Sequence, residues 1–247
     1  MTGLYRIGGK NIRIESIHGA VQERCRDYRT EGKPDFTVRT TLSDLAYEQE
    51  RSDAAAEAEG RSAAAPDSGH LEEQAVYRKI AEKMPEYGTV LFHGSCVAVD
   101  GAAYLFAARS GTGKSTHTRL WRELLGDRAV MVNDDKPLIH VSEDGAEIYG
   151  TPWDGKHRLS SNIRVPLRAV CLLERAEENR IEPVGVRETY PILLRQTYRP
   201  ADPEALAETL ELIDRLVRTV KIYRLRCNME ISAAELSYST MKEGSGK

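Results

Sequence analysis

The chain has 247 residues, and its 35 basic and 38 acidic side chains give a formal net charge of −3, which suits one sizeable domain with a smaller appendage. This balance lacks the basic excess of nucleic-acid-binding proteins, and no apolar run approaches the ~20 residues of a membrane-spanning helix. Because the N-terminus lacks the apolar segment of a signal peptide and the four cysteines form no Cys-x-x-Cys pair, we expect a cytoplasmic protein with free thiols that binds neither nucleic acid nor membrane.

Composition divides the chain into three parts. Residues 1–49 alternate apolar and polar side chains in short runs, which predicts a small β-rich N-terminal lobe. Residues 50–69 are rich in Ala, Glu, Asp, Ser and Gly, which is typical of a solvated linker or a frayed helix. Residues 70–243 are then expected to form a nucleotide-binding domain. It begins with a helix from Leu71 to Met84, where apolar side chains recur at helical spacing.

Two apolar runs, 89–99 and 102–107, are separated by Asp100-Gly101. An Asp-Gly pair between apolar runs is a strong signal for a β-hairpin. The second strand is therefore expected to pair antiparallel with the first, which contains His93. This pairing predicts a mixed sheet rather than a purely parallel one.

The second strand leads into a glycine-rich turn and then a helix, which is the order of elements in a phosphate-binding loop. Glycines allow the tight turn that points backbone N–H groups at phosphate oxygens, and the N-terminus of the helix adds its positive end. Ala108 stands where the usual motif has its first glycine. The residues expected to bind a nucleotide are Ala108, Arg109, Ser110, Gly111, Thr112, Gly113, Lys114, Ser115 and Thr116. Lys114 would reach the outer phosphates and the Ser115 hydroxyl would ligate Mg²⁺; the alternative is a glycine turn with an incidental lysine.

After the helix, an apolar strand at 129–132 ends in Asn133-Asp134-Asp135, and Pro137 follows closely. Two adjacent carboxylates at the end of a buried strand, shortly after a phosphate loop, suit metal-assisted phosphoryl transfer. One carboxylate can hold Mg²⁺ and the other can accept a proton from an attacking hydroxyl. The alternative interpretation is a polar turn closed by the proline.

A loop dense in turn-forming residues follows a second Asp-Gly hairpin at 144–145. Asp154, Lys156, His157 and Arg158 lie in this loop, and we expect them to contact the substrate or, for Asp154, a metal. A solvated surface loop is the alternative. The C-terminal third is expected to be scaffold, with a strand at 168–173, an amphipathic helix at 203–220, a strand at 222–225 and a last helix at 232–241.

Four ordered features together resemble the catalytic domain of HPr kinase/phosphorylase and its related kinases, which share a fold with phosphoenolpyruvate carboxykinase. The features are Phe92-His93-Gly94, the loop 110–115, Asn133-Asp134-Asp135, and 151–155 followed by Asn162 and Val165-Pro166-Leu167. The resemblance covers roughly residues 71–240. It implies an α/β domain with a mixed, partly antiparallel sheet flanked by helices, which transfers phosphate from a nucleotide to a serine or threonine hydroxyl.

The resemblance also assigns roles to individual residues. It implies that Lys114 neutralises the transferring phosphates, that Ser115 and Asp134 bind Mg²⁺, and that Asp135 is the general base. His93 would lie near the reacting phosphate.

The sequence thus predicts a kinase that uses ATP and Mg²⁺ to phosphorylate a Ser or Thr hydroxyl of a protein or peptide. Two alternatives stay open: a kinase for a small hydroxylated molecule, and a nucleotide-binding regulatory protein without catalysis. The sequence also leaves open whether the chain forms a homo-oligomer.

Overall fold

The structure is a computed structural model that describes residues 1–58, 60, 66–155 and 157–243. The chain divides into two compact units, Met1–Lys83 and Met84–Lys247. The sequence predicts a boundary within the linker at 50–69, whereas the units divide after Lys83. Helix α3 (Ser68–Lys83) therefore belongs to the first unit, and α2 (Leu42–Ala58) extends into the expected linker. Residues 59 and 61–65 of that linker lie outside the described residues.

The described residues of the first unit form a three-stranded sheet in the order β1-β2-β3, with β1 antiparallel and β3 parallel to β2. Besides α2 and α3, the elements are β1 (Thr2–Ile7), β2 (Lys10–Glu15), α1 (Gly19–Arg24), η1 (Arg26–Tyr28) and β3 (Phe36–Arg39). Glu72 of α3 is fully buried, and its carboxylate accepts hydrogen bonds from the backbone N–H groups of Ile17 and His18 at 2.6 and 2.7 Å. A buried carboxylate paired in this way fixes α3 within the unit.

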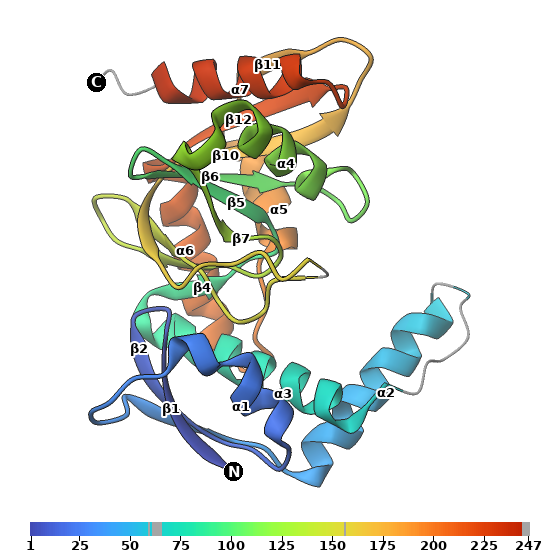
Figure 1. Ribbon diagram of the computed structural model, residues 1–247, viewed down its shortest axis with the longest axis vertical. Helices are drawn as coiled ribbons and strands as arrows, with labels where there is room; N and C mark the ends of the chain where they lie inside the picture. Colours follow the sequence, from blue (N-terminus) through green and yellow to red (C-terminus); the bar gives the residue numbers. More distant parts are fainter. Residues whose placement is uncertain (59, 61–65, 156, 244–247) are drawn as a thin grey trace. The chain divides into compact units, whose positions relative to one another are not determined.

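The described residues of the second unit form a nine-stranded mixed sheet (Figure 1). Its elements are η2 (Met84–Tyr87), β4 (Thr89–Leu91), β5 (Ser95–Val99), β6 (Ala102–Ala107), α4 (Lys114–Leu125), η3 (Gly126–Arg128), β7 (Ala129–Asn133), β8 (Leu138–Val141), β9 (Ala146–Tyr149), β10 (Arg164–Arg175), β11 (Arg180–Pro183), α5 (Val186–Gln196), α6 (Pro203–Thr219), β12 (Lys221–Cys227) and α7 (Ile231–Glu243). The strand order is β4-β8-β9-β10-β6-β5-β7, with β12 paired to β10 and β11 paired to β12. Because β6 is antiparallel to β5 and parallel to β10, the predicted mixed sheet is confirmed.

The two Asp-Gly turns form the hairpins that the sequence predicts. Asp100 and Gly101 both have positive φ, 51° and 80°, as a tight two-residue hairpin turn requires. They set the register in which Ser95 of β5 faces Phe106 of β6. This register brings the start of β5 beside the end of β6, where the glycine-rich loop begins.

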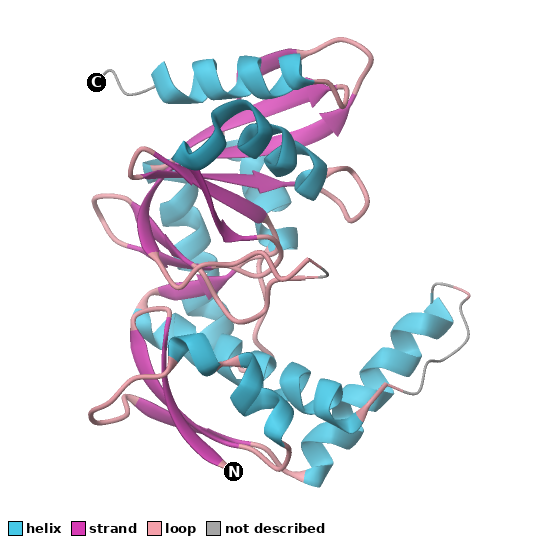
Figure 2. Ribbon diagram, viewed as in Figure 1, coloured by secondary structure: helices cyan, strands magenta, loops and turns pink. Residues whose placement is uncertain are grey.

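Helices cover both faces of the sheet (Figure 2). On one face, Trp121 of α4 is fully buried, 5.0 Å from the ring of Tyr104 on β6 and 5.3 Å from that of Tyr238 on α7. On the other face, Leu193 of α5 and helix α6 pack on side chains of alternate strand residues such as Leu105. The sheet is therefore the middle of three layers.

The predicted C-terminal scaffold is present, with one addition. Helix α6 begins at the predicted Pro203, where the Asp202 carboxylate caps it by accepting from two backbone N–H groups. Helix α5 is not predicted, because Pro191 interrupts its sequence pattern. All four cysteines are free thiols, as predicted. Within the part of the chain that the structure describes, no helix has the length and apolar character needed to cross a membrane.

Candidate functional site

The glycine-rich loop joins β6 to α4 at one edge of the sheet. Gly111 and Gly113 have φ values of 75° and 122°, which non-glycine residues rarely adopt, so the glycines at these two positions are required by the backbone. Gly113 precedes the first residue of α4, and its carbonyl accepts the backbone N–H of His117 at 2.9 Å. The strand, tight turn and helix N-terminus that the sequence predicts are therefore all present.

Lys114 is buried at the start of α4, and its Nζ donates to the carbonyl oxygen of Ala108 at 3.1 Å. This hydrogen bond spans the loop and keeps the ammonium group inside it. Burial lowers the pKa of Lys114, while the negative charge of Asp135 opposes that effect. The lysine of the motif is thus held in the loop within the electrostatic reach of the acidic pair.

Arg175, at the end of β10, binds the loop from the neighbouring strand. Its guanidinium donates to the carbonyl oxygen of Gly111 and to that of Thr112, the latter at 3.2 Å. The parallel register of β10 with β6 places Leu172 beside Ala107, so Arg175 reaches the loop that follows β6. Arg175 could not be identified from the sequence, because only strand pairing brings it to the loop.

Asp134 follows β7 and is buried beside the start of β5. Its Oδ1 accepts a hydrogen bond from the Ser95 hydroxyl at 2.6 Å, and Ser95 Oγ lies 3.0 Å from Thr118 Oγ1 on α4. These contacts connect β5, β7 and α4 through side chains. Ser95 and Thr118 are further residues that the sequence analysis does not identify, since short hydroxyl side chains on buried elements give no distinctive pattern.

Two side chains near the loop offer oxygen donors of the kind that Mg²⁺ prefers. Ser115 is exposed at the first turn of α4, and Asp134 supplies a carboxylate. Mg²⁺ typically takes one or two protein ligands and completes its shell with water and substrate phosphates. No group of three or more His, Cys, Asp or Glu residues that could hold a metal occurs among the described residues.

Asp135 is half-buried and lies beside His93. His93 Nε2 is 3.4 Å from Asp135 Oδ1, and Lys136 Nζ is 3.8 Å from the same oxygen. Burial raises the pKa of Asp135, and the positive charges of Lys136 and Lys114 partly oppose this increase. A carboxylate with a raised pKa is a stronger base than an ordinary aspartate.

His93 lies between β4 and β5 and is held by backbone hydrogen bonds. Its N–H donates to the carbonyl of Gln196 at 2.7 Å, and the next N–H, that of Gly94, donates to the carbonyl of Asp135 at 3.1 Å. Burial, and then the charges of Lys136 and Lys114, lower the pKa of His93 to about 3. His93 is therefore a neutral imidazole at neutral pH.

Asn133 fixes the turn that carries both carboxylates. Its Oδ1 accepts the backbone N–H groups of Asp135 and Lys136 at 2.8 and 2.6 Å. Its Nδ2 donates to the carbonyls of Thr151 and Trp153 at 3.1 and 3.3 Å. The fully buried amide thus joins the acidic turn to the loop after β9.

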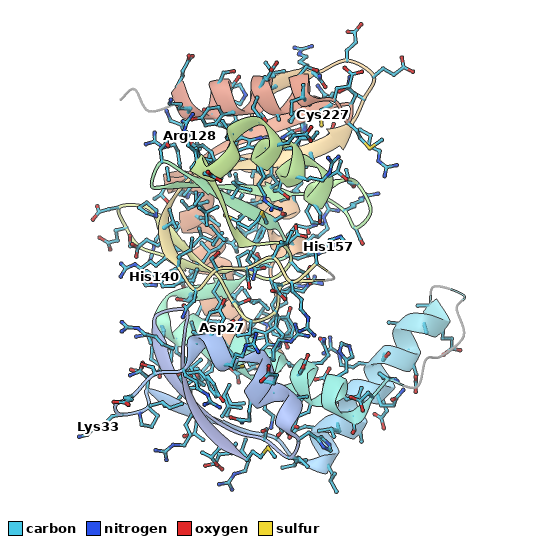
Figure 3. The ribbon with its side chains drawn as sticks, in the orientation of Figure 1. Asp27, Lys33, Arg128, His140, His157 and Cys227 are labelled. Atoms are coloured by element: carbon cyan, nitrogen blue, oxygen red, sulfur yellow. The ribbon has the colours of Figure 1, made fainter. Side chains whose placement is uncertain are left out.

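The predicted substrate-binding residues of that loop divide into three cases. Asp154 is buried, and its Oδ2 accepts from the Ser160 hydroxyl at 3.0 Å. His157 and Arg158 are exposed on the loop between β9 and β10, where Figure 3 labels His157. Lys156 lies outside the described residues.

Gly155 is the residue of this loop that approaches the acidic turn closely. Its φ is 71°, and a Cβ atom placed on it would lie 3.3 Å from the Cβ of Asp135. The loop backbone therefore packs directly against the side chain of Asp135. From the sequence, Gly155 is expected only to be part of a turn.

An open cleft of about 670 Å³ borders the first half of the phosphate loop. We name it the arginine cleft; it is lined by 107–112 of the loop, 172–175 of β10, and Ile192, Arg195 and Gln196 of α5. A second hollow lies by the first turn of α4, where it is lined by Thr116, His117 and the residues 227–229 that end and follow β12. Cys227, labelled in Figure 3, belongs to the second hollow.

Comparison with known proteins supplies a family. Among solved structures, the chain is similar to the HPr(Ser) kinase/phosphatase from Coxiella burnetii, with 10% sequence identity and a TM-score of 0.34. That alignment covers 63% of this chain and 99% of the other. No curated protein matches the chain. A family model described as SynChlorMet cassette protein ScmC matches residues 64–232, which is more than half of the chain. The chain therefore belongs to the ScmC family of SynChlorMet cassette proteins.

Proposed function

We propose that the protein is a kinase that transfers the terminal phosphate of ATP, with Mg²⁺, to a serine or threonine hydroxyl of a protein or peptide. The observation that carries this proposal is the convergence of Lys114, Asp134 and Asp135 at one edge of the sheet. Lys114 interacts electrostatically with both carboxylates, and Asp135 lies 3.4 Å from His93. A phosphate-binding lysine, a carboxylate for a metal and a second carboxylate for a proton are the parts that phosphoryl transfer requires.

The roles of the residues follow from their surroundings. Bound ATP with Mg²⁺ would supply the transferable phosphoryl group with much of its charge neutralised. Residues 108–116 bind the phosphates through backbone N–H groups and Lys114, whose Nζ exchanges the Ala108 carbonyl for phosphate oxygens. Asp134 and Ser115 are the residues of this chain that would hold the metal.

Asp135 acts as general base towards the acceptor hydroxyl. As the acceptor oxygen forms its bond to the terminal phosphorus, the bond from that phosphorus to the departing diphosphate breaks, and the hydroxyl proton passes to Asp135. Its raised pKa strengthens it for this task. His93 is neutral beside it, so it orients the carboxylate without a charge that would lower the basicity of Asp135.

The acceptor is proposed to be a chain rather than an enclosed metabolite because the cleft beside the phosphate loop is open. His157 and Arg158 remain proposed contacts to the acceptor. They are exposed cations on the loop whose Gly155 packs against Asp135.

The test is transfer of label from γ-labelled ATP to the products of neighbouring genes, with the wild-type chain and with Asp135→Asn. We expect Asp135→Asn to reduce transfer by at least about 100-fold, the contribution of a general base, while binding of a fluorescent ATP analogue persists. Asp127→Asn, an exposed carboxylate after α4, is the matched control and should retain full transfer. Unchanged transfer in Asp135→Asn would contradict the proposal. A nucleotide-binding regulatory protein would show nucleotide binding and no transfer in any variant.

A further inference from the structure

The arginine cleft carries an excess of positive charge. Arg109 and Arg195 line it, and neither guanidinium has an ion-pair partner among the described residues. The acidic side chain in the lining, Glu174, pairs with Arg224 and Arg226 of β12. Its charge is therefore compensated, and the two arginines face an opening in which an anion would find uncompensated donors.

The wall of the cleft also holds an unused acceptor. The side-chain carbonyl oxygen of Gln196 is buried within this wall and has no hydrogen-bond partner among the described residues. A buried polar atom without a partner is costly, so each one in a folded protein needs an explanation. Gln196 Oε1 would need a change of side-chain rotamer to reach a ligand in the cleft, whereas the two arginines would pair with a negative charge directly. A peptide with acidic side chains supplies such charges together with backbone N–H donors.

Backbone contacts join the cleft wall to the segment that carries His93. The carbonyl of Gln196 accepts the N–H of His93, and Phe92 forms a β-bridge with Thr197. His93 in turn lies beside Asp135. Two backbone contacts therefore connect the wall of the cleft to the segment that contains His93.

The second hollow, of about 30 Å³, lies beside the later part of the phosphate loop. It adjoins the first turn of α4 through Gly113 and Thr116. The arginine cleft adjoins the earlier part of the loop, from Ala107 to Thr112. The two openings share Thr112 and Arg175 in their linings, and the arginine cleft is the larger of the two.

We propose that the arginine cleft binds acidic side chains that flank the acceptor serine or threonine, so that the substrate is an acidic peptide segment. This inference rests on the proposed kinase function in calling the peptide a substrate. Binding of the peptide can be measured without any phosphoryl transfer. Arg195 is the specificity-determining residue. Arg175 is a positioning residue, because its guanidinium already binds the loop carbonyls.

Binding is tested on the full-length chain with three fluorescein-labelled decapeptides. Each has one central serine, flanked on both sides by glutamates, by glutamines or by lysines. Anisotropy is measured at about 150 mM salt, where long-range attraction is screened. We expect the glutamate peptide to bind at least about tenfold more tightly than the glutamine peptide, as a charge-assisted hydrogen bond permits.

Arg195→Gln is expected to abolish that tenfold preference, and Arg195→Glu to shift preference towards the lysine peptide. Arg199→Gln is the matched control, because Arg199 is also exposed, lies four residues further on and does not line the cleft. It should keep the preference. Binding of a fluorescent ATP analogue should be the same in all variants, and their circular dichroism spectra should match that of the wild type.

Equal binding of the glutamate and glutamine peptides by the wild type would overturn the proposal. So would an equal loss of peptide and ATP-analogue binding in Arg195→Gln, which would make the cleft a nucleotide subsite. The kinase function fails separately: if the glutamate peptide binds through Arg195 but takes no label from ATP, the cleft recognises acidic peptides without phosphorylating them. If the glutamate and glutamine peptides are phosphorylated with equal kcat/KM, the kinase stands and the acidic specificity is wrong.

Discussion

At the scale of single residues, the position of Asp135 depends on groups that have no charge of their own. The side-chain oxygen of Asn133 accepts the backbone N–H of Asp135 at 2.8 Å, and the backbone N–H of Gly94 donates to the carbonyl of Asp135 at 3.1 Å. Gly155 packs against its side chain with room for a hydrogen atom but not for a methyl group without adjustment. The geometry of the proposed base is therefore set by backbone and amide contacts, and charge then adjusts its pKa.

Gly155→Ala should impair catalysis through Asp135. The added Cβ would lie 3.3 Å from the Cβ of Asp135, so one of the two segments must shift. We expect kcat to fall several-fold, because displacement of a catalytic group by about 1 Å can cost about 100-fold and the added methyl group requires a shift of a few tenths of an ångström. KM for ATP should change little. The measurement is steady-state kinetics with an acceptor that the wild type phosphorylates.

Gly101→Ala is the matched control for this substitution. Gly101 also has a positive φ, 80°, but a Cβ there meets nothing within 4 Å. Both variants should therefore lose about 1 kcal/mol of stability from the unfavourable backbone conformation. Only Gly155→Ala should lose activity, and an equal loss in both variants would show that strain alone is responsible.

The pH dependence of activity should report on Asp135. The base must be ionised to act, so kcat/KM should fall as the pH drops through the raised pKa of Asp135, above its ordinary value of about 3.9. Lys136 lowers this pKa by its positive charge. Lys136→Met should therefore raise the pKa and move the acidic limb of the profile to higher pH. His93, with a pKa of about 3, adds no second limb above that value. A limb that stays in place or moves to lower pH in Lys136→Met would refute this assignment.

At the scale of elements, the sequence predicts those whose signals are local. Asp100-Gly101, the loop at 108–116 and the Asp202-Pro203 helix start are each encoded by adjacent residues, and the structure contains all three. Helix α5 is not predicted, because Pro191 interrupts the helical pattern of its sequence. Its Leu193 is nevertheless fully buried. Tertiary burial thus stabilises a helix that propensity disfavours.

The same distinction applies to the site. The loop and the acidic pair could be predicted because they form short motifs, and His93 is predicted only through the family resemblance. Ser95, Thr118 and Arg175 could not, because each reaches the site only through sheet pairing or helix packing. Because α5 forms a wall of the arginine cleft and is not predicted, the cleft could not be predicted from the sequence either.

At the scale of the whole molecule, the candidate site belongs entirely to the second unit. Its earliest residue is His93, and the unit begins at Met84. The second unit has its own buried layers on both faces of the sheet. The first unit has a separate sheet, with side chains such as Tyr5 and Ile12 fully buried. The chemistry and the first unit are therefore separable in principle.

A chain that starts at Met84 should fold and bind nucleotide. We expect its affinity for a fluorescent ATP analogue to stay within about threefold of the full-length value, because the second unit contains all of the proposed contacts to the nucleotide. A threefold change corresponds to about 0.7 kcal/mol of binding free energy. Its thermal unfolding should be a single cooperative transition. The measurements are equilibrium titration and circular dichroism melting. Loss of nucleotide binding in a folded fragment would show that the first unit contributes to the nucleotide site.

The hydrogen bonds from Arg175 to the phosphate loop affect the rate at which a nucleotide should bind. Because two carbonyls of the loop already have a donor, the turn holds its shape before any nucleotide arrives. The phosphate loop then needs little further ordering when a nucleotide binds. The association rate of the nucleotide should therefore be limited by diffusion and docking and not by a slow rearrangement of the loop.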